Sequence, residues 1–446
     1  MPTLNPRHAL SAQIQGLLAR FASDTRLYEL TLKDAPDHLD LALGSGGLLV
    51  EAFAAVETLH SVGARDVIVL STHAHIDLDS LLGRVASLHV SLSDGRRTTF
   101  TGLINQTAQI GSDGGLARYR VRLVPWLWCL TQSFTSRRWQ DKTVIEIIEA
   151  VFAGVAPYAD WRISDEVIPF LAEVPPRSAC AQYRESDFDF VMRLLTEEGL
   201  SWRYEDAPDA PSGHRVVVFA DSTLFPEDAS SAHVLGGNGI RFHSARAGEA
   251  QDSIQAFTAQ RRLNAALTTV TSTDYKRKHT LTHPQAIQAP TVHDYGGVHA
   301  PLLESYDSPG AYAWAHVDAA YHYASLQQQA QEAHNKTWQG HSTVRTLRPG
   351  TQFTLTQAPL DYTGRPPGES PPAYAVISVT SLGINNLPRP AQEGLAELLG
   401  ALPELLEECG RSLALEASAG RVPFITALVK QATTGGYANH FTTIRA

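Results

Sequence analysis

Two histidines and an aspartate near residue 75 form the part of this sequence best suited to metal chemistry. His73, His75 and Asp77 alternate with other residues in the stretch 71–79, which follows the apolar run 66–70. Imidazole nitrogens and carboxylate oxygens bind zinc, and a zinc-bound water is a nucleophile at neutral pH. One interpretation is therefore a metal-dependent hydrolase, with His73 and His75 as ligands and Asp77 as a further ligand or base.

The stretch resembles the metal-binding loop of metallo-β-lactamase-type hydrolases, with one departure. Those loops have another histidine directly after the aspartate, and here that position holds Leu78. They also need distant His and Asp partners, and none is recognisable in this sequence. In an extended strand the three polar side chains simply share one face, while Ala74, Ile76 and Leu78 share the other. We favour the strand, so no catalytic, cofactor-binding or metal-binding residue is predicted and the hydrolase stays an alternative.

Charged side chains at 184–189 are a second candidate. Arg184, Glu185, Asp187 and Asp189 resemble paired carboxylates for acid–base work. Ser186 followed by Asp189, however, is a variant capping box, in which side-chain oxygens accept hydrogen bonds from backbone N–H groups at a helix start. A capped helix explains these residues without chemistry.

The remaining histidines and the cysteines lack the spacing of a metal site. His316 and His322 are six residues apart and do not share a helix face well. We expect both of them to be solvated, together with His334 and His341 in the same polar region. Cys129, Cys180 and Cys409 are scattered and odd in number, which favours reduced thiols.

Composition excludes several classes of protein. The chain has 446 residues, of which 43% are hydrophobic and 18% charged, as in soluble proteins of two to four domains. The net charge of −10 and the lack of a basic run argue against nucleic acid as a partner. No stretch is long and apolar enough for stable membrane insertion, and the N-terminus has no secretory signal. We expect synthesis in the cytoplasm and export, if any, by a machine that reads no such signal.

The pattern along the chain predicts two β-rich regions around a mixed region. Alternating apolar residues predict five short strands at 27–32, 66–71, 87–92, 98–104 and 119–124. From Pro125 the pattern becomes mixed, and Thr143 with Glu146 forms a capping box before a helix. Further segments follow: strands near 220, at 253–263, 266–275, 341–357 and 373–384, and a polar helix at 312–335. Leucines at 395–406 form a helical stripe, which Pro403 should kink or split.

The segment 180–205, CAQYRESDFDFVMRLLTEEGLSWRYE, reads as one compact unit. After the cap at Ser186, Phe190 and Leu194 begin an apolar helix face, and Gly199 suits a left-handed helix end. Alternation then predicts a strand at 200–204.

This segment closely resembles the YRESDxDFVxRLLEEEGIxYxFE stretch of the VgrG family, the spike proteins of type VI secretion systems. Other segments that resemble the family follow in the expected order: 48–61, 81–111, 117–130 (ARYRVRLVPWLWCL), 136–152 (SRRWQDKTVIEIIEAVF), 252–263, 274–278, 303–312 and 436–446 (GYANHFTTIRA). Many ordered matches are specific, although each alone is weak.

The resemblance implies a β-rich α+β fold like that of phage tail hubs. Two antiparallel β-barrel-like domains, at 1–124 and 239–386, would flank a middle α+β domain at 125–238, and a helical segment at 387–446 would lead to the spike. Three chains would form a pseudo-sixfold homotrimeric ring on an Hcp-like tube hexamer, in contact with baseplate proteins and with an effector or adaptor. The implied role is structural and not enzymatic. The hub of a contractile phage tail is a further alternative.

One departure concerns the end of the sequence. Family members continue past the motif near 436–446 into an oligonucleotide-binding fold and a β-helical needle, whereas this sequence stops at Ala446. We therefore expect the piercing function to lie outside these residues. The segment 391–431 also looks longer than in common members, and its leucine stripe predicts either a helical hairpin packed on the body or a partner-binding helix.

Overall fold

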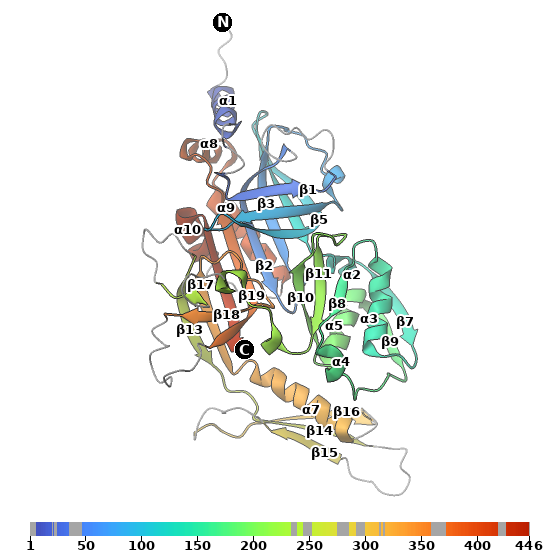
Figure 1. Cartoon of the computed structure of the whole chain (residues 1–446). Coiled ribbons are helices and arrows are strands. Elements are labelled where there is room, and N and C mark those ends of the chain that lie inside the picture. Colours follow the sequence, from blue (N-terminus) through green and yellow to red (C-terminus); the bar gives the residue numbers. More distant parts are fainter. Residues whose placement is uncertain are drawn as a thin grey trace.

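The computed structural model describes residues 6–19, 21, 25–34, 47–232, 239–243, 252–273, 285–290, 299–311, 314, 317–357, 372–417 and 425–445. One twelve-stranded sheet dominates it (Figure 1). Its strand order is β1-β4-β5-β6-β3-β2-β19-β20-β17-β13, with β18 paired to β19 and β12 paired to β18. Among the helices in these ranges, none has the length and apolar character needed to cross a membrane.

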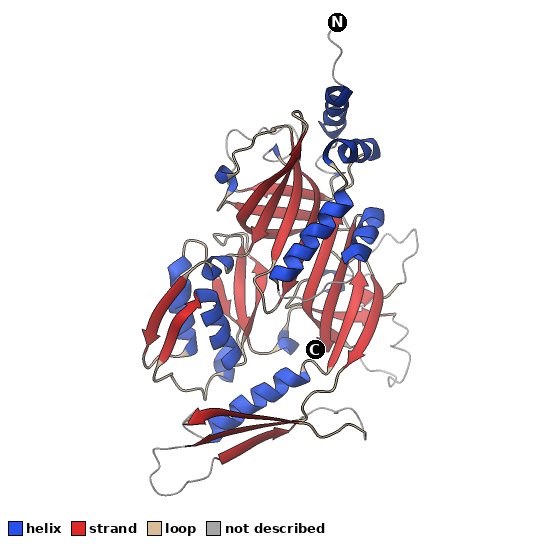
Figure 2. Cartoon of the chain, turned by 180° about the vertical axis from the view of Figure 1, so that it is seen from behind, coloured by secondary structure: helices blue, strands red, loops and turns tan. Residues whose placement is uncertain are grey.

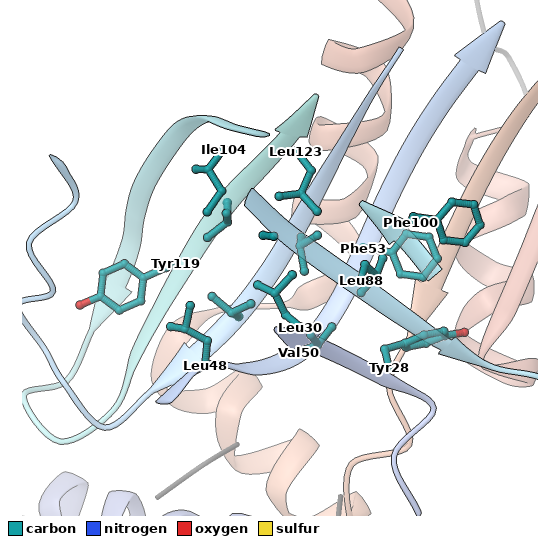
Figure 3. Packing of buried hydrophobic residues seen from close by; sticks show 14 of the residues in the cluster. Tyr28, Leu30, Leu48, Val50, Phe53, Leu88, Phe100, Ile104, Tyr119 and Leu123 are labelled. Carbon is teal, nitrogen blue, oxygen red and sulfur yellow. The ribbon is translucent and has the colours of Figure 1, made fainter. Parts of the chain in front are cut away.

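The first half of the sheet curls around an apolar core. Its strands are β1 (Tyr28–Leu32), β2 (Leu49–Thr58), β3 (Ala64–Ser71), β4 (Val85–Ser91), β5 (Arg97–Ser112) and β6 (Ala117–Val124), all paired antiparallel. Leu30, Phe53, Leu88 and Leu123 meet inside the curl (Figure 3). The side chain of Asn385 bridges the seam between β1 and β2. The five strands predicted in this region are all present.

The second half repeats this architecture. Its strands are β12 (Ile240–Arg241), β13 (Ile254–Arg261), β17 (Lys336–Ser342), β18 (Gln352–Thr356), β19 (Ala373–Ile384) and β20 (Tyr437–Arg445). Phe257, Phe353 and Phe441 pack ring against ring in its core. A bridge from Phe242 to Ile254 joins the end of β12 to β13, so six strands again close on themselves.

Strand β19 belongs to both halves. Its first residues pair with β18, its last residues pair with β2, and its other edge pairs with β20 throughout. The two halves are therefore one continuous hydrogen-bonded surface. Residues 437–445, at the end of the expected helical segment 387–446, form the strand β20 between β19 and β17.

Four helices pack on this sheet (Figure 2). They are α1 (Pro6–Ala19), α8 (Arg389–Leu399), α9 (Leu402–Glu416) and α10 (Ile425–Gly435). Leu406, Leu413 and Leu428 of α9 and α10 cover the outer face of β2, β3 and β19, as the hairpin interpretation predicted. Gly400, with φ of 88°, separates α8 from α9, and Pro403 lies in the first turn of α9, so the predicted split is confirmed.

The middle part is a mixed α+β unit beside the first half. Its strands are β7 (Phe134–Trp139), β8 (Trp161–Ile163), β9 (Cys180–Ser186), β10 (Ser201–Asp206) and β11 (His214–Phe219). Its helices are α2 (Trp128–Thr131), α3 (Val144–Phe152), α4 (Val167–Phe170) and α5 (Asp187–Glu197). The short helix α6 (Ala229–Ala232) contacts the second half, where Ser231 Oγ accepts the N–H of Thr354 at 3.3 Å. Both predicted caps are present: Thr143 and Glu146 form a full capping box, and the Ser186 hydroxyl accepts the N–H of Asp189 at 2.9 Å. Short 3₁₀ turns lie at Asp79–Leu81, Ala153–Val155 and Ser222–Leu224.

A small arm projects from the second half (Figure 1). Helix α7 (Val317–Glu332) lies on a sheet of β14 (Leu267–Thr273), β15 (Gln285–Pro290) and β16 (Glu304–Ala311). The predicted polar helix is confirmed over this shorter range. Leu326 of α7 packs against Gly199, and the hydroxyl of Tyr323 donates to Glu198 at 3.3 Å. These contacts anchor the arm to the middle part.

Candidate functional site

The prediction of a strand through His73, His75 and Asp77 is wrong. Strand β3 ends at Ser71, and 72–78 form a loop. The reason is pairing: Ser71 lies opposite Ala117, the first residue of β6, so the chain beyond Ser71 has no β6 partner. The hydroxyl of Tyr119 fixes the loop instead, since it donates to the His73 carbonyl at 2.7 Å and accepts the N–H of Ile76 at 3.2 Å.

This loop does not assemble a metal site. His75 and Asp77 are exposed and His73 is half-buried. Within the described ranges, no group of three or more His, Cys, Asp or Glu side chains is placed to hold a metal ion. The metal-dependent hydrolase therefore finds no support in the structure.

The carboxylates at the start of α5 have structural partners. Asp187 is buried and accepts hydrogen bonds from Thr135 Oγ1 at 2.8 Å and Gln182 Nε2 at 2.7 Å, with Arg137 Nη2 at 3.2 Å. Its carboxylate thus ties the helix start to β7 and β9. Asp189 belongs to the cap, where Ser186 Oγ donates to its Oδ2 at 2.7 Å. Glu185 pairs with Arg193 at 2.7 Å.

The other residues considered for chemistry stay apart. His322 lies on α7 beside Phe170, at the wall of a cavity of about 340 Å³, whereas His316 lies outside the described residues. Cys129, Cys180 and Cys409 are free thiols. Burial raises the pKa of Cys409 to about 11, so its thiol stays protonated at neutral pH.

A buried polar layer that the sequence analysis missed joins the sheet to its helices. Arg118 of β6 donates to both carboxylate oxygens of Glu51 at 2.8 Å, and also to the Leu399 and Gly400 carbonyls at the end of α8. Four residues on, Arg122 donates to both oxygens of Asp66. These ion pairs hold the strands together and fix the end of α8.

Arg122 also reaches α9. Its Nη1 donates to Glu416 at 2.6 and 2.8 Å, so a single guanidinium links β6, β3 and α9. Burial lowers the pKa of Arg122, but its bonds to Asp66 and Glu416 outweigh that effect and raise it. Burial raises the pKa of Glu51, against the opposing effect of Arg118. One feature of the sequence could have revealed this buried polar layer: arginines at 118, 120 and 122 alternate with apolar residues.

A second joint connects three parts of the molecule around Phe100. The guanidinium carbons of Arg65 on β3 and Arg348 of the second half lie 3.6 and 4.1 Å from its ring centroid. Arg348 also pairs with Asp206 of β10 at 2.6 Å. Cation–π contacts and ion pairs thus fix both halves of the sheet and the middle part in one arrangement.

Two histidines of the second half form a close pair. His341 on β17 lies directly opposite His440 on β20, with ring centroids 5.0 Å apart and planes at 64°. Both lie on the outer face of the sheet, since the neighbouring Phe441 points into the core and Gly340 lies against its ring. Burial, and then His341, lower the pKa of His440 to about 4. Burial also lowers the pKa of His341, so both rings are neutral at pH 7. Because 98 positions lie between them, spacing did not reveal this pair. His341 is half-buried on a strand, and not solvated in a helical region as expected from the sequence.

Known proteins with similar sequences include spike proteins of type VI secretion systems. The chain is 29% identical over 314 residues to the type VI secretion system spike protein VgrG5 of Pseudomonas aeruginosa, an alignment that covers 70% of this chain and 36% of VgrG5. It is 29% identical over 210 residues to the spike protein VgrG1a of the same bacterium, covering 42% and 30%. The chain thus spans only about a third of the length of these relatives.

Solved structures share the fold. A prophage MuSo2 tail protein of 43 kDa from Shewanella oneidensis matches with a TM-score of 0.54 and 10% identity, over 94% of this chain and 98% of that one. The E. coli c3393 protein, described as a type VI secretion component similar to bacteriophage T4 tail proteins gp27 and gp5, matches with a TM-score of 0.53 and 16% identity, over 94% and 77%. The family model of the phage tail baseplate hub (GPD) matches residues 56–386, about three quarters of the sequence. The chain therefore belongs to the phage tail baseplate hub family.

Proposed function

We propose that this chain is the hub of a type VI secretion spike, in which three copies form a ring on a hexameric Hcp-like tube. The observation that carries the proposal is the doubled architecture of the sheet, two closed six-stranded halves joined through β19. Three copies present six such halves, which matches the symmetry of a hexamer. The likeness to VgrG spike proteins favours the secretion system.

The proposed role is mechanical and not enzymatic. Buried ion pairs from Arg118 and Arg122, together with the joint at Phe100, fix the parts of each copy relative to one another. Such a body transmits force from the tube to the spike without internal rearrangement. Baseplate proteins and an effector or adaptor are the further partners that this role requires. The protein would remain in the cytoplasm before assembly and leave with the machine.

Within this function the parts have separate roles. Residues 1–124 and 239–386 serve as the two tube units, with β20 completing the second, and residues 125–238 form the outer part of the ring. The helices of 387–446 hold the outer face of the tube units. Assignment of these roles rests on the position of each part in the fold.

Light scattering of the purified chain, with and without an Hcp-like hexamer, tests the proposal. We expect a mass of three copies, and a complex of one trimer with one hexamer. A monomer that does not bind the hexamer at micromolar concentration contradicts the proposal of a trimeric ring. Cryo-electron microscopy of the complex then shows whether six sheet halves face the six tube subunits.

The hub of a contractile phage tail is a second candidate. The observation in its favour is the prophage tail protein, which this chain covers over 98% of its length. Binding to a phage tube protein instead of an Hcp-like hexamer, measured side by side, would select this alternative.

A further inference from the structure

The two-stranded ribbon of β7 and β9 has an exposed face of unusual composition, which we call the ribbon face. Figure 1 shows both strands at the outer rim of the middle part, away from the large sheet. Six side chains of the two strands are exposed: Phe134, Ser136, Arg138, Ala181, Tyr183 and Arg184. None of them is acidic, although the whole chain has a net charge of −10. The ribbon face is therefore a basic and aromatic patch on an acidic protein.

Two aromatic rings lie open on the ribbon face. Phe134 is 70% exposed and Tyr183 is 72% exposed, which are the largest fractions of any Phe, Tyr or Trp side chain that the structure describes. Aromatic residues and arginine are enriched in the centres of protein interfaces, where a few side chains account for most of the binding energy. Two open rings beside two arginines have the composition of such a centre.

A β-bulge places Tyr183 and Arg184 on the same face. One residue of β7, Ser136, lies opposite these two residues of β9. Successive residues of a strand normally point to opposite faces, but here both side chains are exposed. The bulge holds Arg184 at a φ of 52°, a left-handed conformation that is unfavourable for a residue with a Cβ. Glycine would adopt it without strain, so the backbone alone does not require arginine at this position.

The opposite face of the ribbon is anchored to the middle part. The ring of Trp139 stacks on Phe190 of α5, with centroids 5.0 Å apart. Gln182 Nε2 donates to the buried Asp187 carboxylate at 2.7 Å. The ribbon face is thus presented on a fixed support, and its backbone loses little conformational freedom when a partner binds.

The two exposed arginines determine the charge of the partner. Arg137, on the other face of the ribbon, is paired with Asp187. In the described part of the chain no carboxylate pairs with Arg138 or Arg184. Guanidinium groups form strong, two-point hydrogen bonds with carboxylates, so an acidic surface complements these two. Two arginines on a chain of net charge −10 are too few for the phosphate contacts that nucleic acid binding needs.

We propose that the ribbon face is a docking site for an acidic polypeptide segment of a partner protein. Carboxylates of the segment pair with Arg138 and Arg184, and an apolar side chain of the segment packs against Phe134 and Tyr183. The ribbon face is distinct from the large sheet on which the proposed hub function depends, so either one can fail without the other.

Selection from a random library of short peptides, with the purified full chain as the target, tests the site. We expect the enriched peptides to combine Asp or Glu with Leu, Phe or Trp, and added salt to weaken their binding in fluorescence anisotropy. Phe134→Ser and Arg184→Gly should each weaken binding at least about tenfold, as truncation in the centre of an interface does. Because Arg184→Gly removes the backbone strain, it should not lower the urea midpoint. Loss of binding without loss of stability would show that the Arg184 side chain acts in the contact.

Two controls separate this contact from general effects. Asp141, in the turn after β7, is also exposed with a φ of 52°, so Asp141→Gly makes the same change to the backbone and should keep the binding. Leu415→Ser/Arg389→Ser removes an exposed apolar residue and an exposed guanidinium from α9 and α8, and should keep it too.

Three outcomes overturn the proposal. The first is that the enriched peptides lack acidic residues, or bind Phe134→Ser and Arg184→Gly as tightly as the unchanged chain. The second is that a fluorescent oligothymidine binds more tightly than these peptides and loses its binding in the same variants. The third is that the mass in light scattering falls in these two variants alone, which would identify the occupant as a second copy of the chain.

Discussion

The side chain of Asn385 and the backbone of Tyr28 form two hydrogen bonds, one in each direction. The side-chain Nδ2 of Asn385 donates to the Tyr28 carbonyl at 3.0 Å, and its Oδ1 accepts the Tyr28 N–H at 3.3 Å. The same Nδ2 donates to the Val50 carbonyl at 2.7 Å. One amide at the end of β19 therefore takes the place of a ladder between β1 and β2 and closes the first half of the sheet.

Replacement of Asn385 with leucine should open this seam. The substitution keeps the volume but leaves the backbone groups of Tyr28 and Val50 without partners in a buried place, at a cost of about 3 kcal/mol or more. Urea unfolding measures the loss, and hydrogen exchange should rise first at Tyr28. The matched variant is Asn386→Leu: Asn386 is exposed, so its loss should cost much less. Equal losses in the two variants would contradict the role of the seam.

Replacement of Arg118 alone should destabilise the protein more than replacement of Arg118 and Glu51 together. Arg118→Met leaves the Glu51 carboxylate buried without its partner, which costs about 3 to 5 kcal/mol. In Arg118→Met/Glu51→Leu no charge remains, so part of that stability should return. Urea midpoints of the three proteins form the comparison. Arg389→Met, which breaks an exposed pair with Glu393, should change stability by less than about 1 kcal/mol. A double variant no more stable than the single one would refute this account.

Stability should fall as the pH drops from about 6.5 to about 4, in part because of His214. Its Nδ1 donates to the Ser212 carbonyl at 2.9 Å and its Nε2 accepts the N–H of Trp126 at 3.1 Å. Burial lowers the pKa of His214 to about 4, so in this range the unfolded chain binds a proton that the folded chain does not. The loss from this one group is roughly 3 kcal/mol by pH 4.

His214→Gln isolates this effect. A glutamine oxygen can accept the Trp126 N–H but does not titrate, so the variant should have a flatter stability curve between pH 6.5 and 4. His440, whose pKa is also lowered, still contributes to the remaining slope. Thermal unfolding at half-unit pH steps gives both curves, and parallel curves for the two proteins would exclude His214 as a cause.

A methyl group at Gly199 should loosen the arm. Gly199 has φ of 69°, and an added Cβ would lie 2.5 Å from Leu326 Cδ2 on α7. Gly83 is the matched position, because its φ is 76° but nothing lies near its missing Cβ. Gly83→Ala thus shows the backbone strain alone, about 1–2 kcal/mol. Gly199→Ala should lower the stability more than Gly83→Ala does and should make α7 more susceptible to limited proteolysis. Equal cleavage of the two variants would show that the position of α7 does not depend on this contact.

The helices α3 and α5 could be predicted from the sequence because their signals are local. In each, a side chain caps a backbone group three residues away, and the apolar residues repeat at helical spacing. The sequence therefore defines the apolar face of each helix, and the rest of the fold only has to cover that face. The split at Pro403 was predictable for the same reason.

The features that hold the parts together depend on distant residues. Asn385 and Tyr28 are 357 positions apart, and Arg118 and Glu51 are 67 apart. A single sequence carries no pairing information over such distances. The prediction of a strand over 72–78 was wrong for a related reason. The alternation of polar and apolar residues suits a strand, but a strand also requires a neighbouring strand. The ladder between β3 and β6 ends at Ser71, so residues 72–78 have no such neighbour in β6.

The central position of β20 constrains the order in which the protein can fold. Strand β20 pairs with β19 on one edge and with β17 on the other, yet the ribosome makes it after every other strand of the sheet. Until residues 437–445 emerge, β17 and β19 have unpaired edges, and exposed edges of this kind favour aggregation. Nascent chains should therefore depend on chaperones until translation of this strand is complete, and copies should not associate before that point.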